Sequence, residues 1–120
     1  MPVPILKQGD TLIASIVAAL SDEDLLQFRD DLAQKIGNVR ARGVVIDVTA
    51  LDVLDSFATR TLRGIAYTAK LRGAETVIVG IQPEVAYTLV QLGLTFEGVS
   101  TSLDLEEGLA LLAAKKQARK

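Results

Sequence analysis

The chain has 120 residues, of which 49% are hydrophobic and 23% charged, and its formal net charge is −2. This balance is typical of a folded globular chain, so we expect one domain over residues 1–120 and exclude a disordered protein. The charges of both signs are interspersed, which argues against a nucleic-acid partner. Cysteine and histidine are both absent, which excludes Cys–His and Ser–His–Asp catalysis and zinc sites built on thiolate or imidazole.

The sequence has no feature that would place it in or across a membrane. No apolar run approaches the roughly 20 residues that a helix needs to span a bilayer. The start, Met1-Pro2-Val3-Pro4, has neither the charged region nor the apolar core of a signal peptide. We therefore expect a cytoplasmic protein, and the absence of cysteine agrees with that compartment.

The first elements in the chain are predicted to be a hairpin and a long helix. Residues 5–7 and 11–17 read as short strands around a turn at Gly9, and the prolines before them restrict the first strand to an edge. Ser21 and the three acids after it are typical of a helix start. Apolar residues then recur at helical spacing, with Gly43 as the predicted stop. They are Leu25, Phe28, Leu32, Ile36 and Val39.

The middle of the chain contains a predicted central strand followed by a helix. Residues 44–48 are a nearly unbroken apolar, β-branched run, the pattern of a strand that is buried on both faces. A polar connection follows at 47–55, and a helix is predicted to begin near Ser56. Its apolar stripe comprises Ala58, Leu62, Ile65, Ala66 and Ala69. On the opposite, outward side we expect Ser56, Thr59, Arg60, Arg63, Tyr67 and Lys70.

The remaining elements continue the alternation of strands and helices. A buried strand is predicted at 76–80, a short edge strand at 99–101, and helices after Pro83 and after Asp104. The apolar sides of the two helices are predicted to be Val85, Ala86, Leu89 and Leu92 in the first and Leu105, Leu109, Leu112 and Ala113 in the second. Gly108 is expected to weaken the last helix slightly. The fold class is therefore α/β, a mixed, mostly parallel sheet covered by amphipathic helices.

One motif at the strand-to-helix junction points to a family. The residues Asp55-Ser56-Phe57-Ala58-Thr59-Arg60 after Val-Val-Ile-Asp-Val resemble the signature of STAS domains, specifically the RsbS-type stressosome scaffolds. The resemblance covers essentially the whole chain and implies the STAS (SpoIIAA-like) fold. In that family the serine of this motif is the phosphoacceptor for a partner kinase, a role that falls on Ser56. The related anti-anti-sigma factors carry Asp-Ser-Ser-Gly, and this chain lacks the second serine and the glycine.

The resemblance implies a bacterial, non-enzymatic protein without catalytic residues or cofactors. Such a scaffold co-assembles with RsbR-type STAS proteins and sequesters an RsbT-type serine kinase in general stress signalling. Phosphorylation of Ser56 would release the kinase, a PP2C-type phosphatase would reverse the modification, and the protein would form self- or co-oligomers. Two alternatives stay open: an anti-anti-sigma factor that binds an anti-sigma kinase, and a small phosphate- or nucleotide-binding enzyme using the loop at 47–55.

The residues around Ser56 allow a more detailed hypothesis. Asp55 is suited to cap the helix, which would leave the Ser56 hydroxyl free for a kinase. The helix N-terminus, with Arg60 or Arg63, could accommodate a phosphate, while Asp55 would repel it. Thr59 is expected to be an accessory contact on the same face. Three acids in this region could suggest magnesium, but neither a glycine-rich phosphate cradle nor a lysine accompanies them, so no metal site is predicted.

Overall fold

A computed structural model describes residues 3–96 and 98–118 of the protein and shows an α/β architecture. The chain order is β1 (Ile5–Gln8), β2 (Thr11–Ser15), α1 (Asp22–Val39), β3 (Gly43–Asp47), α2 (Ser56–Leu71), β4 (Glu75–Val79), α3 (Pro83–Gln91), β5 (Ser100–Ser102) and α4 (Leu105–Ala118). Within the described residues, no helix is both long and apolar enough to cross a membrane. The predicted order of strands and helices is confirmed.

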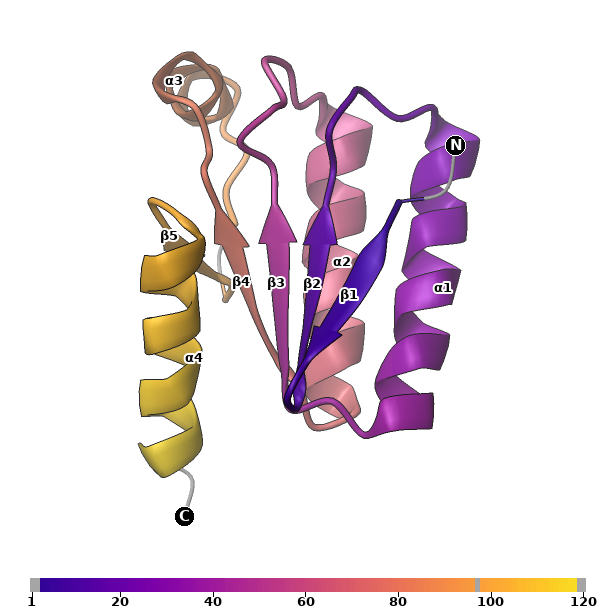
Figure 1. The fold of residues 1–120 in the computed structure, drawn as a ribbon. Helices are drawn as coiled ribbons and strands as arrows, with labels where there is room; N and C mark the ends of the chain where they lie inside the picture. The colour runs from indigo at the N-terminus through magenta and orange to yellow at the C-terminus, as the bar shows by residue number, and fades with distance from the viewer. Residues whose placement is uncertain (1–2, 97, 119–120) are drawn as a thin grey trace.

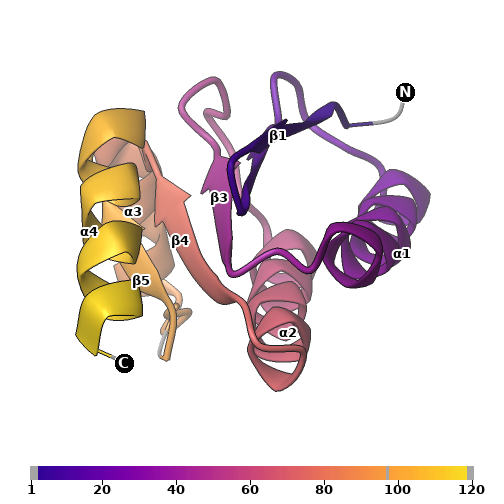
Figure 2. The same cartoon turned by 60° about the horizontal axis from the view of Figure 1, so that its bottom comes forward.

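The strands form a five-stranded mixed sheet in the order β1-β2-β3-β4-β5. β1 and β2 are the predicted antiparallel hairpin, whereas the pairs from β2 to β5 are parallel. Helices α1 and α2 cover one face of the sheet and α4 covers the other, while α3 lies beyond the end of β4 (Figures 1 and 2). β3 is therefore the central strand, as predicted.

The core lies on both faces of β3. Val44, Val45 and Ile46 are completely buried. Val44 and Ile46 belong to the large cluster under α1 and α2, and Val45 belongs to a smaller cluster with Leu112 of α4. Because neither face of the strand meets water between Val44 and Ile46, these residues are all apolar, and the polar Asp47 comes only at the end of the strand.

The two ends of α1 show one confirmed prediction and one wrong one. Ser21 caps the helix by accepting a hydrogen bond from Asp24 N at 3.1 Å, and the Asp24 carboxylate completes a capping box. Gly43 does not stop the helix, because Arg40 already takes the left-handed conformation (φ 52°) that ends it. Gly43 begins β3 beneath α4, where an added Cβ would lie 3.1 Å from Leu112 Cδ1.

The apolar faces of α3 and α4 differ from the predicted stripes. Leu105 and Ala113 are exposed, and the buried residues of α4 are Gly108 and Leu112. An added Cβ at Gly108 would lie 2.6 Å from Val79 Cγ1, so this glycine lets α4 approach β4 closely. In α3, Val85 and Leu89 are buried as predicted, but Ala86 and Leu92 are exposed.

An ion pair links the C-terminal part of α4 to the sheet. The Lys116 ammonium donates to both carboxylate oxygens of Asp10 at 2.5 Å, which joins α4 to the hairpin turn. This hydrogen bond holds the pKa of Asp10 below its ordinary value. Since both side chains are partly exposed, the pair contributes at most about 1 kcal/mol.

We predict opposite effects of the same substitution at two helical glycines. Gly108→Ala should lower the free energy of unfolding by about 1 kcal/mol, because overpacking against Val79 outweighs the gain in helix propensity. Gly64→Ala is the matched control: nothing lies within 4 Å of its added Cβ, so it should raise stability by about 0.5–1 kcal/mol. Urea unfolding followed by circular dichroism measures both. Equal stabilisation by the two substitutions would show that the packing of α4 against β4 does not require a glycine at position 108.

Candidate functional site at the start of helix α2

The connection from β3 to α2 places the predicted site at the carboxyl end of the central strand. Buried Val48, Leu51 and Leu54 anchor this connection in the core, whereas Val53 and Asp55 are exposed. The apolar residues of the loop therefore fix it to the core, and the start of α2 lies at the surface.

Hydrogen bonds from both sides hold the first part of this loop. Asp47 Oδ1 accepts from Thr49 N at 2.9 Å and from Thr49 Oγ1 at 2.6 Å. Gln82 Nε2 donates to the Thr49 carbonyl at 2.8 Å, which links the loop to the start of α3. Gly80 (φ 81°) lies so close that an added Cβ would be 2.9 Å from Thr49 Cβ. The loop that leads to Ser56 is thus packed against the neighbouring β4–α3 connection.

The predicted cap of α2 is confirmed. Asp55 is the N-cap residue, and its Oδ1 accepts a hydrogen bond from Ala58 N at 2.7 Å. Ser56 is the first residue of the helix and is half-buried, and its hydroxyl forms no hydrogen bond with any described residue. Capping by Asp55 therefore leaves the Ser56 hydroxyl available for chemistry.

Thr59 does not lie on the exposed face, so that prediction is wrong. Its side chain is completely buried, and its Oγ1 donates to the Asp55 carbonyl at 2.9 Å. This bond to the preceding turn satisfies the hydroxyl and allows it to pack inside. Thr59 is therefore a structural residue of the first turn and cannot contact a partner in this structure.

The two arginines predicted near Ser56 have different surroundings. Arg60 is exposed and has no hydrogen-bond or ion-pair partner among the described residues. Arg63 is half-buried and donates from Nη1 to the Thr95 carbonyl at 2.9 Å, which ties α2 to the segment after α3. Arg60 is the cation that remains free one helical turn from Ser56, and Arg63 has a structural role.

Sequence reasoning missed an apolar surface beside Ser56. A small hollow of about 70 Å³ lies between the β2–α1 and β3–α2 loops, and its lining includes Leu20, Val53 and Asp55. Val53 is 64% exposed, and Val17 on the β2–α1 loop is 71% exposed. Exposed valines in both loops are a weak signal for a contact surface, which becomes clear only when the fold brings the loops together.

Two of the three acids of this region form hydrogen bonds within the region itself. Asp47 holds Thr49 and Asp55 caps α2. Over residues 3–96 and 98–118, no group of three or more acidic, histidine or cysteine side chains is placed to bind a metal ion. The geometry thus gives two of these carboxylates structural partners within the chain.

Comparisons with known proteins agree on one family. The model of the STAS domain matches residues 3–108. A serine-to-glutamate variant of RsbS from Moorella thermoacetica is 42% identical, with a TM-score of 0.81 and 98% of each chain covered. A structure of the stressosome, described as a signal integration and transduction hub, contains a chain that is 41% identical, with a TM-score of 0.74, covering 98% of this chain and 100% of that one.

A curated relative extends the comparison to longer proteins. The RsbT co-antagonist protein RsbRA of Bacillus subtilis is 27% identical over 97 residues, which is 81% of this chain. The match spans only 35% of that relative, so the chain corresponds to about a third of its length. The similarity therefore concerns the STAS portion of that protein.

We predict that Asp55 and Ser56 contribute differently to stability. Asp55→Ala should lower the free energy of unfolding by about 1 kcal/mol, because the N–H of Ala58 loses its acceptor. Ser56→Ala should change it by less than about 0.5 kcal/mol, since the hydroxyl has no partner among the described residues. Chemical denaturation of both variants is the measurement. A larger loss for Ser56→Ala than for Asp55→Ala would mean that the serine is the structural cap.

Proposed function

Because this chain belongs to the STAS domain family, we propose that it is a stressosome scaffold of the RsbS type. The observation that carries this proposal is the similarity to RsbS, with 42% identity over 98% of both chains. We place the protein in the cytoplasm as a non-enzymatic binding protein in which residues 1–120 form one STAS domain. In this proposal the protein binds partner proteins, and it is itself phosphorylated.

The partners in this proposal are of two kinds. RsbR-type proteins are expected because the RsbT co-antagonist RsbRA carries a segment similar to 81% of this chain. The two STAS domains would pack into one assembly, in which the remainder of the longer protein lies outside the shared fold. The second partner is an RsbT-type serine kinase, which the assembly would sequester until stress releases it.

Ser56 would be the switch that releases the kinase. Its hydroxyl is free of hydrogen bonds within the described part of the chain and lies at the N-terminus of α2. A phosphate there would add about −1.5 to −2 charges, and the N–H groups of the first turn together with Arg60 would stabilise it. Because Asp55 stabilises the helix without help from Ser56, phosphorylation would leave the fold intact.

The surroundings of Ser56 explain how a phosphate could weaken kinase binding. Val53 and the small hollow, whose lining includes Asp55, form apolar surface next to the serine. A partner packed there would bury Ser56, and a doubly charged group in such an interface costs desolvation energy. The nearby Asp55 carboxylate adds like-charge repulsion. Removal of the phosphate by a PP2C-type phosphatase would restore the binding surface.

The test is phosphorylation and retention of an RsbT-type kinase. With ATP present, the kinase should modify Ser56, and Ser56→Ala should abolish labelling while the nearby Thr61→Ala should not. Without ATP, Ser56→Asp should weaken kinase retention at least 10-fold relative to Ser56→Asn, because the two side chains have similar size and differ in charge. Phosphopeptide mapping and pull-down measure these effects.

Two results would contradict this assignment. The first is stoichiometric phosphate on Thr61 or another residue with Ser56 unmodified. The second is equal kinase retention by Ser56→Asp and Ser56→Asn, which would mean that negative charge at this position does not weaken the complex.

A further inference from the structure

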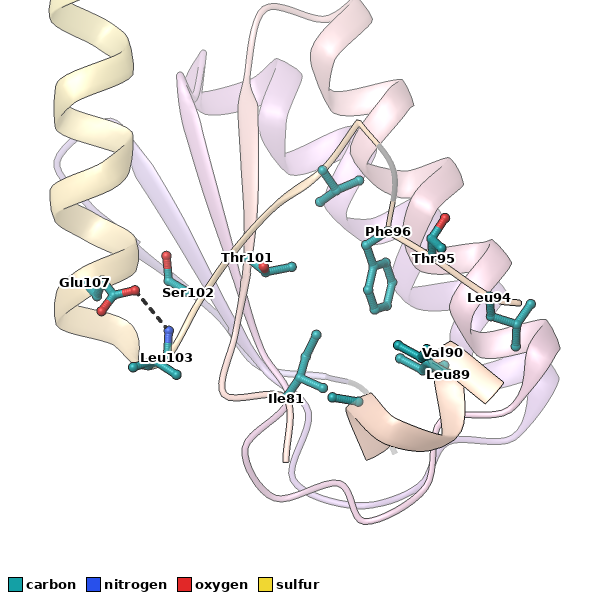
Figure 3. A pocket seen from close by; sticks show the side chains of 12 residues that line it. Ile81, Leu89, Val90, Leu94, Thr95, Phe96, Thr101, Ser102, Leu103 and Glu107 are labelled. Carbon is teal, nitrogen blue, oxygen red and sulfur yellow. Dashed lines mark hydrogen bonds between the residues drawn. The ribbon is translucent and has the colours of Figure 1, made fainter. Parts of the chain in front are cut away.

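An open apolar groove of about 590 Å³ lies at the β5 edge of the sheet, between α3, β5 and the start of α4 (Figure 3). Its walls include Leu89 and Val90 of α3, Phe96, and Leu103. This volume is within the usual range of about 300–1,000 Å³ for ligand sites. The groove shares no lining residue with the hollow beside Ser56.

The rim of the groove exposes large apolar side chains. Val90 is 75% exposed and Leu103 is 80% exposed, and they come from opposite sides of the groove. Solvent-exposed apolar walls around a concave site are typical of a surface that another molecule covers. The apolar lining alone does not indicate which kind of molecule binds there. The unpaired edge of β5, which lines the groove, does indicate it.

The groove runs along the free edge of β5. β5 is the last strand of the sheet and pairs with β4 alone within the described residues. Thr101 faces the α2 side of the sheet with its register partner Ile78, whereas Ser102 pairs with Val79, which faces α4. Both Thr101 and Ser102 line the groove, so the groove passes around the edge of the strand.

The backbone of β5 has hydrogen-bonding groups that point away from β4, toward the open edge of the sheet. The Ser102 carbonyl is turned toward β4, where it accepts from Gly80 N at 3.1 Å. Because successive residues of a strand direct their backbone groups to opposite sides, the N–H and carbonyl of Thr101 point away from β4. The N–H of Leu103 also points outward, and it donates to Glu107 Oε1 at 3.3 Å.

We propose that this groove binds an extended peptide from a partner protein, which pairs with β5 as an additional strand. The Thr101 backbone supplies one donor and one acceptor for that pairing, and alternate apolar side chains of the peptide fill the space between Val90 and Leu103. Glu107 is the charged side chain among the described lining residues. Since it lies on the α4 side of β5, the side chains of the peptide that face it are lysine or arginine.

The test uses a fluorescent hexapeptide of alternating lysine and valine with blocked ends, added to the full chain. Fluorescence anisotropy gives the affinity, and ¹⁵N–¹H NMR locates the shifted amides. Methylation of one central peptide nitrogen should weaken binding at least 10-fold, because it removes a backbone donor and keeps the side chains. Replacing the lysines by glutamates should weaken it similarly through repulsion by Glu107.

Substitutions in the protein test the same site independently of the changes to the peptide. Thr101→Pro removes only an outward N–H, which an edge strand tolerates, and Val90→Asp places a charge in the wall; each should weaken binding at least 10-fold. Leu6→Asp is the matched control, because Leu6 is 64% exposed on the opposite edge strand β1, and it should change the affinity less than 2-fold. Val90→Asp and the methylated peptide keep the test valid if Thr101→Pro does not fold.

Three outcomes of the peptide-binding experiments would overturn the proposal. They are equal affinity for the methylated and unmethylated peptides, amide shifts that lie outside the groove, and a Kd unchanged in Val90→Asp. A concentration-dependent dimer that Val90→Asp dissociates and that the peptide cannot displace would also overturn it, because the occupant would then be a second copy of the chain. Sedimentation velocity of the protein without peptide detects that case.

Discussion

The burial of β3 on both faces is the constraint on which the rest of the structure depends. Val44 and Ile46 are covered by α1 and α2, and Val45 is covered by α4. An apolar strand in this position requires helices on both sides of the sheet. Polar residues are then confined to the end of the strand and to the connection that follows it. After β3, the chain presents its next polar groups in the connection from β3 to α2, which leads to Ser56.

The same constraint bears on how the start of α2, the site of the proposed switch, is held in place. Buried Leu51 and Leu54 fix the loop from below, while Asp47, Gln82 and Gly80 hold Thr49 from the side. Asp55 then stabilises the first turn, and the hydroxyl of Ser56 has no hydrogen-bond partner in the described part of the chain. A residue in such a position can be modified with little structural cost, and the effect of the modification would fall on the surface that we propose partners contact.

Much of the fold could be predicted from the sequence because its signals are local. The β-branched run at 44–48, the acids after Ser21 and the Asp55-Ser56 junction each specify an element or a cap within a few residues. The errors arise where packing between distant segments decides. Thr59 is buried because its hydroxyl is satisfied within the helix, and Arg63 is bonded to Thr95, 32 residues later. The sequence predicts that Gly108 weakens the last helix, whereas its close packing against Val79 is visible only in the folded chain.

The two surface features beyond the motif were not predictable for the same reason. The hollow beside Ser56 combines two loops, and the groove along β5 combines α3, β5 and α4. No periodicity relates these segments, so their apolar residues read as ordinary exposed positions in the sequence. The family signature identifies Ser56, but it does not indicate how the neighbouring surfaces are shaped.

The central claim is that the chain is a scaffold that assembles with a longer STAS-domain protein, and the mass of the co-expressed pair tests it most directly. Size-exclusion chromatography with light scattering should show both proteins in one complex much larger than either alone, since their STAS segments share a fold. Elution of each protein at its own mass over a range of salt concentrations would contradict the account.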